Sequence, residues 1–224
     1  MAIKRRDLCE KYRIGHAKVL LDFGISNITS NNNYWFDNPN MYCVVIKERG
    51  SDELLGGIRI QIADGKTELP VEKAISKMDS KIHQIVSKFL LNGGIGELNG
   101  LWVDNRLRGW GIGPYLVRAA ISTTNQLKFK TMIGICGENT MSMFRQVGFV
   151  VDDSVGKNGS FPYPSDDLKA HVVGILDSEN LHTALEPDKS IMINLRLNPV
   201  QIINESTGNN LSTIHYNLIY PELN

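Results

Sequence analysis

The sequence contains little of what marks several common classes of protein. It has three cysteines in 224 residues, Cys9, Cys43 and Cys136, and none of them forms a Cys-x-x-Cys pair. A disulfide framework and a metal site are therefore not expected, and a reducing cytoplasm fits best. No uninterrupted apolar run approaches about 18 residues, the length at which a membrane span becomes credible. The charged start MAIKRRDLCE lacks the apolar core of a secretory signal, so we expect no signal peptide.

The chain also has no excess charge of either sign. Lys plus Arg and Asp plus Glu number 24 each, so the formal net charge is zero. A neutral chain has no long-range attraction to nucleic acid or to an anionic membrane, and we expect neither as a partner. Any anion-binding site must therefore be local.

Hydrophobic periodicity predicts both helices and strands. Apolar residues recur at helical spacing over 7–23 and, most clearly, over 71–91. β-Branched runs at 41–47 and 54–63 predict two strands joined as an antiparallel hairpin. Further strands are expected at 96–103, 131–136, 170–176, 191–197 and 213–220, further helices at 114–125 and 139–147, and loops at 27–40 and 154–167. The fold class is therefore α+β with a mixed, mostly antiparallel sheet.

The most informative segment is VDNRLRGWGIGPYL, which runs from Val103 to Leu116 between a predicted strand and a predicted helix. Its alternating glycines let the backbone turn tightly and expose N–H groups. The start of the helix adds unpaired N–H groups and a positive dipole end, so the turn can bind a phosphate-sized anion. A Walker loop needs a lysine that is missing here, and a Rossmann fingerprint needs glycine where Pro114 stands. A turn without a ligand is the alternative.

Arg108, Gly111 and Gly113 resemble the Arg/Gln-x-x-Gly-x-Gly/Ala loop of the GNAT acyltransferases. The order of elements over 41–151 is similar as well, and FRQVGF resembles that family's final helix-to-strand signal. The resemblance implies a GNAT-like fold with splayed central strands. It implies a single domain over 1–224, with its core at 41–151, a helical insertion at 66–95 and a C-terminal extension at 168–224. We expect the extension to form an acceptor lid or a homodimer face.

The same resemblance assigns roles to residues of the loop and of the strand before it. Acetyl-CoA or another acyl-CoA would be the co-substrate, without a metal. Its pyrophosphate would bind at Arg108, Gly109, Trp110, Gly111, Ile112 and Gly113. Leu101, Trp102 and Val103 would offer backbone groups to the pantetheine arm and an N–H to the thioester oxygen.

An amine that attacks a thioester must lose a proton, so a base is needed nearby. Glu97 lies on the same predicted strand as Val103, and strand alternation predicts that both side chains share one face. Some GNAT members carry a general-base glutamate at this point, and a structurally paired glutamate is the alternative. Many members use a tyrosine to reprotonate the CoA thiolate where this chain has Phe144, so either Tyr115, Tyr163 or water would substitute, or CoA would leave as the thiolate.

A second resemblance concerns the acceptor. Arg59 and Glu97 match positions in acyl-homoserine-lactone and N-acyl-amino-acid synthases, which implies an amino-acid-like acceptor with Arg59 as its carboxylate clamp. Gly100 stands where those synthases tend to have arginine, and a solvent-facing Arg59 is the alternative. The sequence thus predicts an N-acyltransferase, an acetyltransferase first of all, that acts on a small-molecule amine. A catalytically silent acyl-CoA-binding module and a synthase of the second kind are the alternatives.

Overall fold

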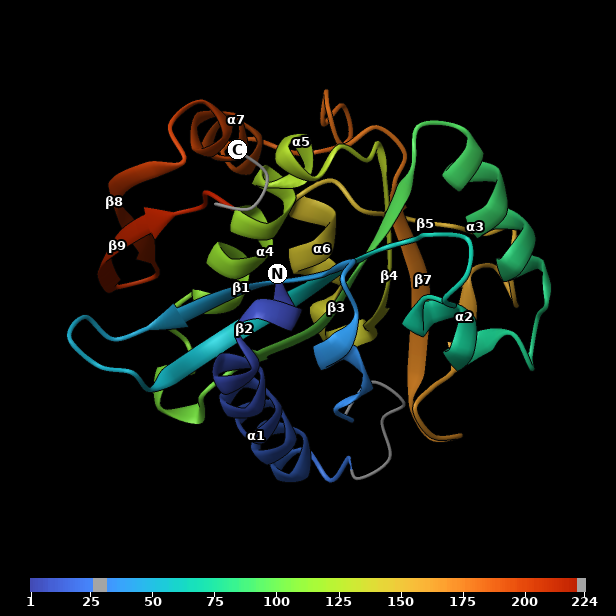
Figure 1. Cartoon of the computed structure of the whole chain (residues 1–224), viewed down its shortest axis with the longest axis horizontal. Helices are drawn as coiled ribbons and strands as arrows, with labels where there is room; N and C mark the ends of the chain where they lie inside the picture. Colours follow the sequence, from blue (N-terminus) through green and yellow to red (C-terminus); the bar gives the residue numbers. More distant parts are fainter. Residues whose placement is uncertain (26–31, 221–224) are drawn as a thin grey trace.

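A mixed seven-stranded sheet forms the centre of the computed structural model, which describes residues 1–25 and 32–220 (Figure 1). The strand order is β1 (Met41–Lys47), β2 (Leu54–Ile62), β3 (Ile95–Val103), β4 (Thr131–Gly137), β7 (Lys169–Ile175) and β5 (Val150–Val151), and β6 (Ser160–Pro162) also pairs with β7. Within the described residues, β3 and β4 are the one parallel pair. The predicted α+β class and mostly antiparallel sheet are confirmed.

The parallel pair separates soon after it begins. Ile95 lies opposite Thr131, and Glu97 lies opposite Ile133, where the pairing ends. Beyond this point the two strands line opposite sides of a cavity. The predicted splay of the central strands is therefore present.

Helices cover both faces of the sheet (Figure 1). They are α1 (Arg6–Asp22), α2 (Pro70–Ile75), α3 (Lys81–Leu91), α4 (Ile112–Ser122), α5 (Thr124–Leu127), α6 (Met141–Gln146) and α7 (Asp188–Leu197). The largest hydrophobic cluster joins α4 and α6 to the sheet, and a second joins α1 to the other face through Tyr12 and Trp102. A Cβ added at Gly15 would lie 2.2 Å from the Trp102 ring, which explains a glycine in the middle of α1.

The predicted helix at 71–91 is two helices, α2 and α3. Asp79 interrupts the helix between them, because its carboxylate accepts hydrogen bonds from the N–H groups of Lys81 (3.0 Å) and Gly156 (2.9 Å). Met78, predicted to lie on the apolar face, is 45% exposed. A side chain that bonds to backbone N–H groups thus competed successfully with helical continuity.

The predicted strand at 191–197 is wrong, because this segment lies in α7. Met192 and Leu195 are buried whereas Ile193 and Leu197 are exposed, which is a helical pattern. The apolar residues at 191, 193, 195 and 197 also fit a period of two, so periodicity alone could not decide.

Two strands form a separate antiparallel hairpin after α7. They are β8 (Val200–Thr207), which the sequence pattern did not predict, and β9 (Asn210–Asn217), which overlaps the prediction at 213–220. The predicted strand at 170–176, by contrast, is β7 and pairs with β4 in the main sheet. It therefore belongs to the central sheet and not to an extension outside it.

A buried ionic network fastens this hairpin and α7 to α4. The Arg118 guanidinium donates to Asp188 Oδ1 (3.0 Å) and to Glu205 Oε2 (2.7 Å), and the Tyr216 hydroxyl donates to Glu205 Oε1 (2.7 Å). Figure 1 shows β8, β9 and α7 on the side of the molecule where α4 lies. Among the helices described, none is long and apolar enough to span a membrane.

Candidate active site

A cavity of about 220 Å³ opens where β3 and β4 separate. It passes between the two strands, because α1 contributes to its wall from one face of the sheet and α6 from the other. The side chains in its wall that carry chemistry are those of His16, Glu97, Asn99, Cys136 and Tyr163. The splay thus brings the predicted Glu97 into a partly open, mostly apolar cavity.

Glu97 is 2% exposed, and its Oε2 accepts a hydrogen bond of 2.7 Å from the N–H of Val71. Val71 lies in the first turn of α2, where N–H groups have no partner within the helix. Burial raises the pKa of Glu97 to about 8, although the Val71 hydrogen bond and the Arg59 charge act in the opposite direction. The side chain therefore holds its proton at neutral pH until a cation arrives or the pH rises.

Glu97 and Val103 lie on opposite faces of the sheet, so the prediction that they share one face is wrong. Gly100 has φ +63°, and the register with β2 shifts between Gly57 and Arg59. This bulge inserts an extra residue and reverses the alternation. Val103 consequently packs against the hydrophobic cluster of α4, whereas Glu97 contacts α2 on the other face.

Arg59 lies outside the cavity wall. It is 1% exposed, so the solvent-facing alternative is wrong, and its guanidinium lies 4.7 Å from the Trp35 ring and 5.6 Å from the Tyr12 ring. A Cβ added at Gly100 would come within 2.7 Å of Arg59 Nε, so Gly100 leaves room for the buried cation. From this position Arg59 acts on the cavity through its charge.

The glycine-rich turn leads from the end of β3 into α4. Gly109 (φ +83°) faces open space, and Gly111 (φ +74°) immediately precedes the first residue of α4. Arg108 is exposed, donates to Asn105 Oδ1 at 3.0 Å and lies 5.5 Å from the Phe23 ring. The first N–H groups of α4 therefore follow directly after the turn, and the exposed Arg108 guanidinium lies beside Asn105 and Phe23.

The other predicted cofactor residues lie next to this turn. Leu101 lines the cavity, Trp102 is buried against α1, and Val103 is half-buried on the α4 face. Trp110 is 38% exposed, and Ile112 is buried in the core below the turn. A Cβ added at Gly113 would meet Met143 Sδ at 3.5 Å, an ordinary contact.

The tip of the β8–β9 hairpin lies on the glycine turn, a contact that the sequence did not indicate. Thr207 Oγ1 lies 2.9 Å from the Tyr115 hydroxyl, and Asn210 Nδ2 donates to the Gly109 carbonyl at 3.1 Å. A Cβ added at Gly111 would lie 2.0 Å from Thr207 Oγ1. No local pattern could reveal this contact, because it joins segments about 100 residues apart in the chain. The sequence of the glycine turn gives no sign that another segment packs on it.

Among the three predicted substitutes for the missing tyrosine, Tyr163 lines the cavity, whereas Tyr115 is engaged with Thr207. Phe144 itself lines the cavity and packs edge-on against Phe149, with ring centroids 5.2 Å apart. Burial raises the pKa of Cys136 to about 11, so its thiol is a poor nucleophile at neutral pH.

Sequence reasoning missed His16 and Asn99 as residues of the site. His16 lies in α1, far from β3 along the chain, whereas Asn99 lies on β3 two residues after Glu97. Burial and, to a smaller extent, the nearby charge of Arg59 lower the pKa of His16 to about 3, so the imidazole is neutral. The strand alternation that indicated Glu97 could also have indicated Asn99, whereas His16 could be assigned to the site only once the fold was known.

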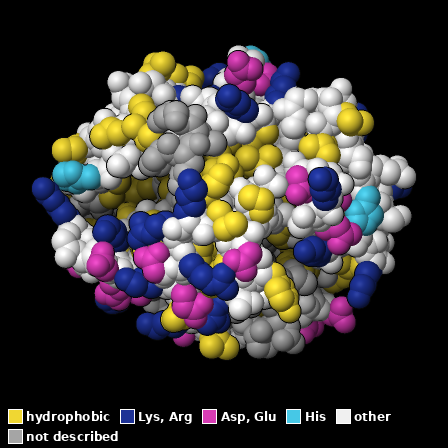
Figure 2. Space-filling model, viewed as in Figure 1, with side chains coloured by type: hydrophobic (Ala, Val, Ile, Leu, Met, Phe, Trp, Pro, Cys, Tyr) yellow, Lys and Arg dark blue, Asp and Glu magenta, His cyan; other side chains and the backbone are white. Residues whose placement is uncertain are grey.

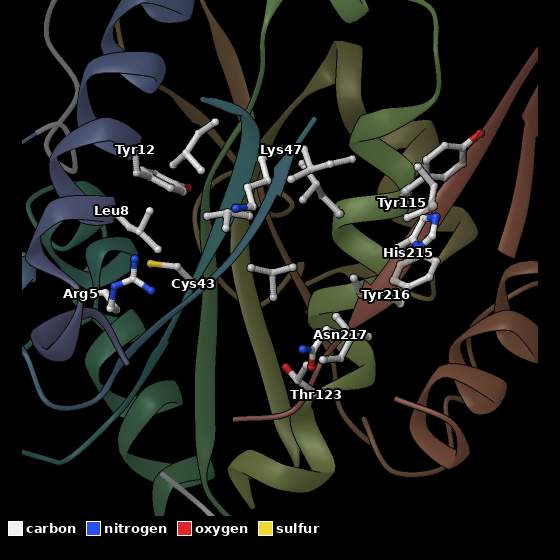
Figure 3. Close-up of a pocket in the computed structure, with 18 of the residues that line it drawn as sticks. Arg5, Leu8, Tyr12, Cys43, Lys47, Tyr115, Thr123, His215, Tyr216 and Asn217 are labelled. Carbon is white, nitrogen blue, oxygen red and sulfur yellow. The ribbon is translucent and has the colours of Figure 1, made fainter. Parts of the chain in front are cut away.

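A second, larger cavity of about 820 Å³ lies elsewhere, between β1 on one side and α4 with β9 on the other. In Figure 3, Arg5, Leu8 and Tyr12 lie on the side of α1, and Tyr115, His215 and Asn217 lie on the side of α4 and β9, with Cys43 and Lys47 of β1 between them. Figure 2, in the orientation of Figure 1, shows exposed hydrophobic side chains in the middle of this face of the molecule, with charges of both signs around them. This cavity does not contain Glu97, which lies in the wall of the smaller one.

Comparisons with known proteins agree with this geometry. The model of the acetyltransferase (GNAT) family matches residues 18–149, more than half of the chain, although no curated protein matches in sequence. FeeM, an N-acyl amino acid synthase from uncultured soil microbes, superposes with a TM-score of 0.61 at 11% identity, over 80% of this chain and 96% of its own.

Two acyl-homoserine lactone synthases that depend on CoA share the fold as well. BjaI has a TM-score of 0.55 at 13% identity, over 87% of this chain and 85% of its own. MesI has a TM-score of 0.54 at 12% identity, over 91% and 92%. With the family match and the splayed sheet together, the chain belongs to the GNAT family and is an N-acyltransferase that uses an acyl-CoA as co-substrate.

Proposed function

We propose that this enzyme transfers an acyl group, acetyl or longer, from CoA to the primary amine of a small molecule by direct attack on the thioester. The observation that carries the proposal is the position of Glu97. It is a buried carboxylate of raised pKa at the point where β3 and β4 separate, in a cavity that reaches both faces of the sheet. Perturbed titratable groups in such a cleft are typical of catalytic sites.

The two substrates would reach the cavity from opposite faces. The glycine turn and Leu101 belong to the side of α4 and α6, which suits the acyl-CoA. Glu97 and His16 belong to the side of α1 and α2, which leaves that side for the amine. The nucleophile and the thioester then meet in the gap between the strands, where positioning alone lowers the barrier.

In this mechanism the amine enters as an ammonium ion, and its charge favours the ionised form of Glu97. Glu97 then releases its own proton to solvent and accepts one from the ammonium, and the free amine nitrogen attacks the thioester carbonyl carbon. A backbone N–H of β3 near the bulge stabilises the oxyanion. The C–S bond then breaks, and the CoA thiolate takes a proton from the Tyr163 hydroxyl or from water. The tyrosinate or hydroxide formed in this way removes the extra proton from the amide nitrogen.

Two alternatives have specific observations in their favour. Phe144 in the cavity wall suits a silent acyl-CoA-binding module, because it cannot reprotonate the leaving thiolate. The shared fold of FeeM, BjaI and MesI favours an amino-acid-like acceptor with Arg59 as its clamp. The aromatic packing of Arg59 argues against a clamp, because the guanidinium would have to leave Trp35 and Tyr12.

The cofactor half of the proposal is tested by thermal unfolding with CoA, acetyl-CoA and longer acyl-CoAs. A ligand at 100 times its dissociation constant adds about 2.7 kcal/mol to the free energy of unfolding. Arg108→Glu should weaken binding by roughly 10- to 100-fold, since a hydrogen bond between charged groups contributes about 1.5–3 kcal/mol. Lys157→Glu, at an exposed position before β6, is the matched charge reversal and should bind as the wild type does. No stabilisation of the wild type by any CoA species would contradict the proposal.

The catalytic half is tested by Glu97→Gln, with CoA release as the readout. General-base catalysis typically contributes 10²–10⁴-fold, so we expect a loss in kcat of about this size with the acyl-CoA shift retained. An unchanged rate would remove Glu97 from the mechanism. Wild-type protein that binds acyl-CoA and acylates no amine would establish the silent module instead.

A further inference from the structure

The cavity wall contains no cationic side chain among the described residues. Its ionisable members are Glu97, the neutral His16, Cys136 and Tyr163. Residues 26–31, outside the described part, have the sequence SNITSN and contain no ionisable side chain. The cavity can therefore neutralise an ammonium ion through Glu97, whereas Arg59 lies outside the wall, packed against Trp35 and Tyr12, and offers an anion in the cavity no direct contact.

Instead the wall contains uncharged groups that lack partners. His16 is 4% exposed, and among the residues that the structure describes its ring nitrogens have no hydrogen-bond partner. A neutral imidazole has one N–H donor and one acceptor nitrogen. An unpartnered, buried imidazole in a cavity wall is suited to bind an uncharged polar group.

Asn99, on β3, also has uncharged polar groups without partners. Its Nδ2 and Oδ1 are both shielded from solvent, and neither has a hydrogen-bond partner among the described residues. Each buried polar group left unpaired costs about 1–3 kcal/mol, which a ligand that pairs with it would offset. Oδ1 needs a donor, and a carboxylate has none, whereas a carboxamide or a hydroxyl can both donate and accept.

We propose that the acceptor is a primary amine that carries an uncharged hydrogen-bonding group, a carboxamide or a hydroxyl, bound by His16 and Asn99, and that carries no free carboxylate. The inference rests on the proposed function and defines its substrate class. A free amino acid would bring a carboxylate into a wall without a cation, and an unpaired buried charge costs several kcal/mol. The volume of about 220 Å³ lies below the usual range for drug-sized ligands, so the buried part of the acceptor is small.

The test compares three matched amines on the full chain at saturating acyl-CoA, with CoA release as the readout. They are alaninamide, 2-aminopropan-1-ol and alanine. We expect kcat/KM for the amide and the alcohol to exceed that for alanine by at least about 100-fold, where each tenfold corresponds to 1.4 kcal/mol. The alcohol and alanine have amines of similar basicity, so their comparison isolates the carboxylate.

Variants then test the binding groups. Asn99→Leu and His16→Leu should each raise KM for alaninamide by about tenfold, with the thermal shift by acyl-CoA retained as evidence of folding. Thr140→Val is the matched control, because Thr140 lines the same cavity but its hydroxyl already donates to the Gly137 carbonyl at 3.1 Å. It should leave the ranking of the three amines unchanged.

Two outcomes would overturn the inference alone. Alanine could be acylated as well as its amide or better, and loss of that activity in Arg59→Met would then establish a carboxylate clamp. Alternatively, Asn99→Leu and His16→Leu could leave KM for alaninamide unchanged. Failure to acylate any of the three, while acyl-CoA still stabilises the chain, would overturn the proposed function and the inference together.

Discussion

Replacing Glu97 by glutamine should make the protein more stable at alkaline pH while it removes activity. In the folded chain Glu97 keeps its proton up to a pKa of about 8, whereas the ordinary value is 4.5. Unfolding between these pH values therefore releases a proton, and the free energy of unfolding falls as the pH rises. The contribution is fully present below pH 4.5 and is lost once the pH passes about 8.

The magnitude follows from the same two values. A tenfold change in proton affinity corresponds to about 1.4 kcal/mol, so the wild type should lose roughly 4 kcal/mol between pH 5 and pH 8.5 through this group alone. Glutamine imitates the protonated form and can still accept the hydrogen bond from Val71. The variant should therefore lack this loss, which for a chain of this size corresponds to about 10 °C in Tm.

The assay is urea unfolding of the wild type and Glu97→Gln at several pH values from 5 to 8.5. His16 is present in both proteins, so its own titration cancels in the difference between them. We expect the variant to gain stability relative to the wild type as the pH rises. Parallel stability curves would refute the reasoning, because they would show that Glu97 ionises as an ordinary carboxylate and has no raised pKa to use.

Two further predictions concern the glycine turn and the hairpin on it. Gly111→Ala should lower Tm and weaken acyl-CoA binding by more than Gly109→Ala does. Both positions have positive φ, which costs a residue other than glycine about 1–3 kcal/mol, but a Cβ at Gly111 also meets Thr207. Equal losses in the two variants would contradict the contact with Thr207. Arg118→Met should cost about 3–5 kcal/mol in urea unfolding, because it leaves Glu205 charged and buried without its cation. The double variant with Glu205→Gln should recover part of that loss, and no recovery would show that the ion pair is not the cause.

The sequence predicted the parts of the fold that depend on local pattern. The strands at 41–47, 54–63 and 96–103 agree with β1, β2 and β3 to within a residue, because β-branched runs bounded by turn residues leave little choice. The glycine turn was predicted in the same way, since Gly109 and Gly111 have positive φ just before α4 begins. In both cases neighbouring residues contain the whole signal.

The sequence failed where tertiary contacts decide. The segment at 191–197 fits a strand or a helix equally, and packing against α4 selects the helix. The face of Val103 depended on one bulge at Gly100, which reverses everything after it. His16 could not be assigned to the site at all, because α1 reaches the cavity only after it has packed on the sheet.

The residues that weaken the pairing of the central strands lie next to the point where β3 and β4 separate around the cavity. Gly100 forms the bulge in β3, and on β4 a Cβ at Gly134 would come within 2.9 Å of the Leu98 carbonyl oxygen, so the two strands are in close contact just before they separate. Glycine in a strand lowers stability, and here two strands carry one on either side of the same gap. Glu97, a buried carboxylate without a charged partner at hydrogen-bond distance among the described residues, lies beside them at a further cost. Sequences depart from local rules mainly at functional sites, so these three departures beside the cavity of about 220 Å³ support the proposal that the splay between β3 and β4 is the catalytic site.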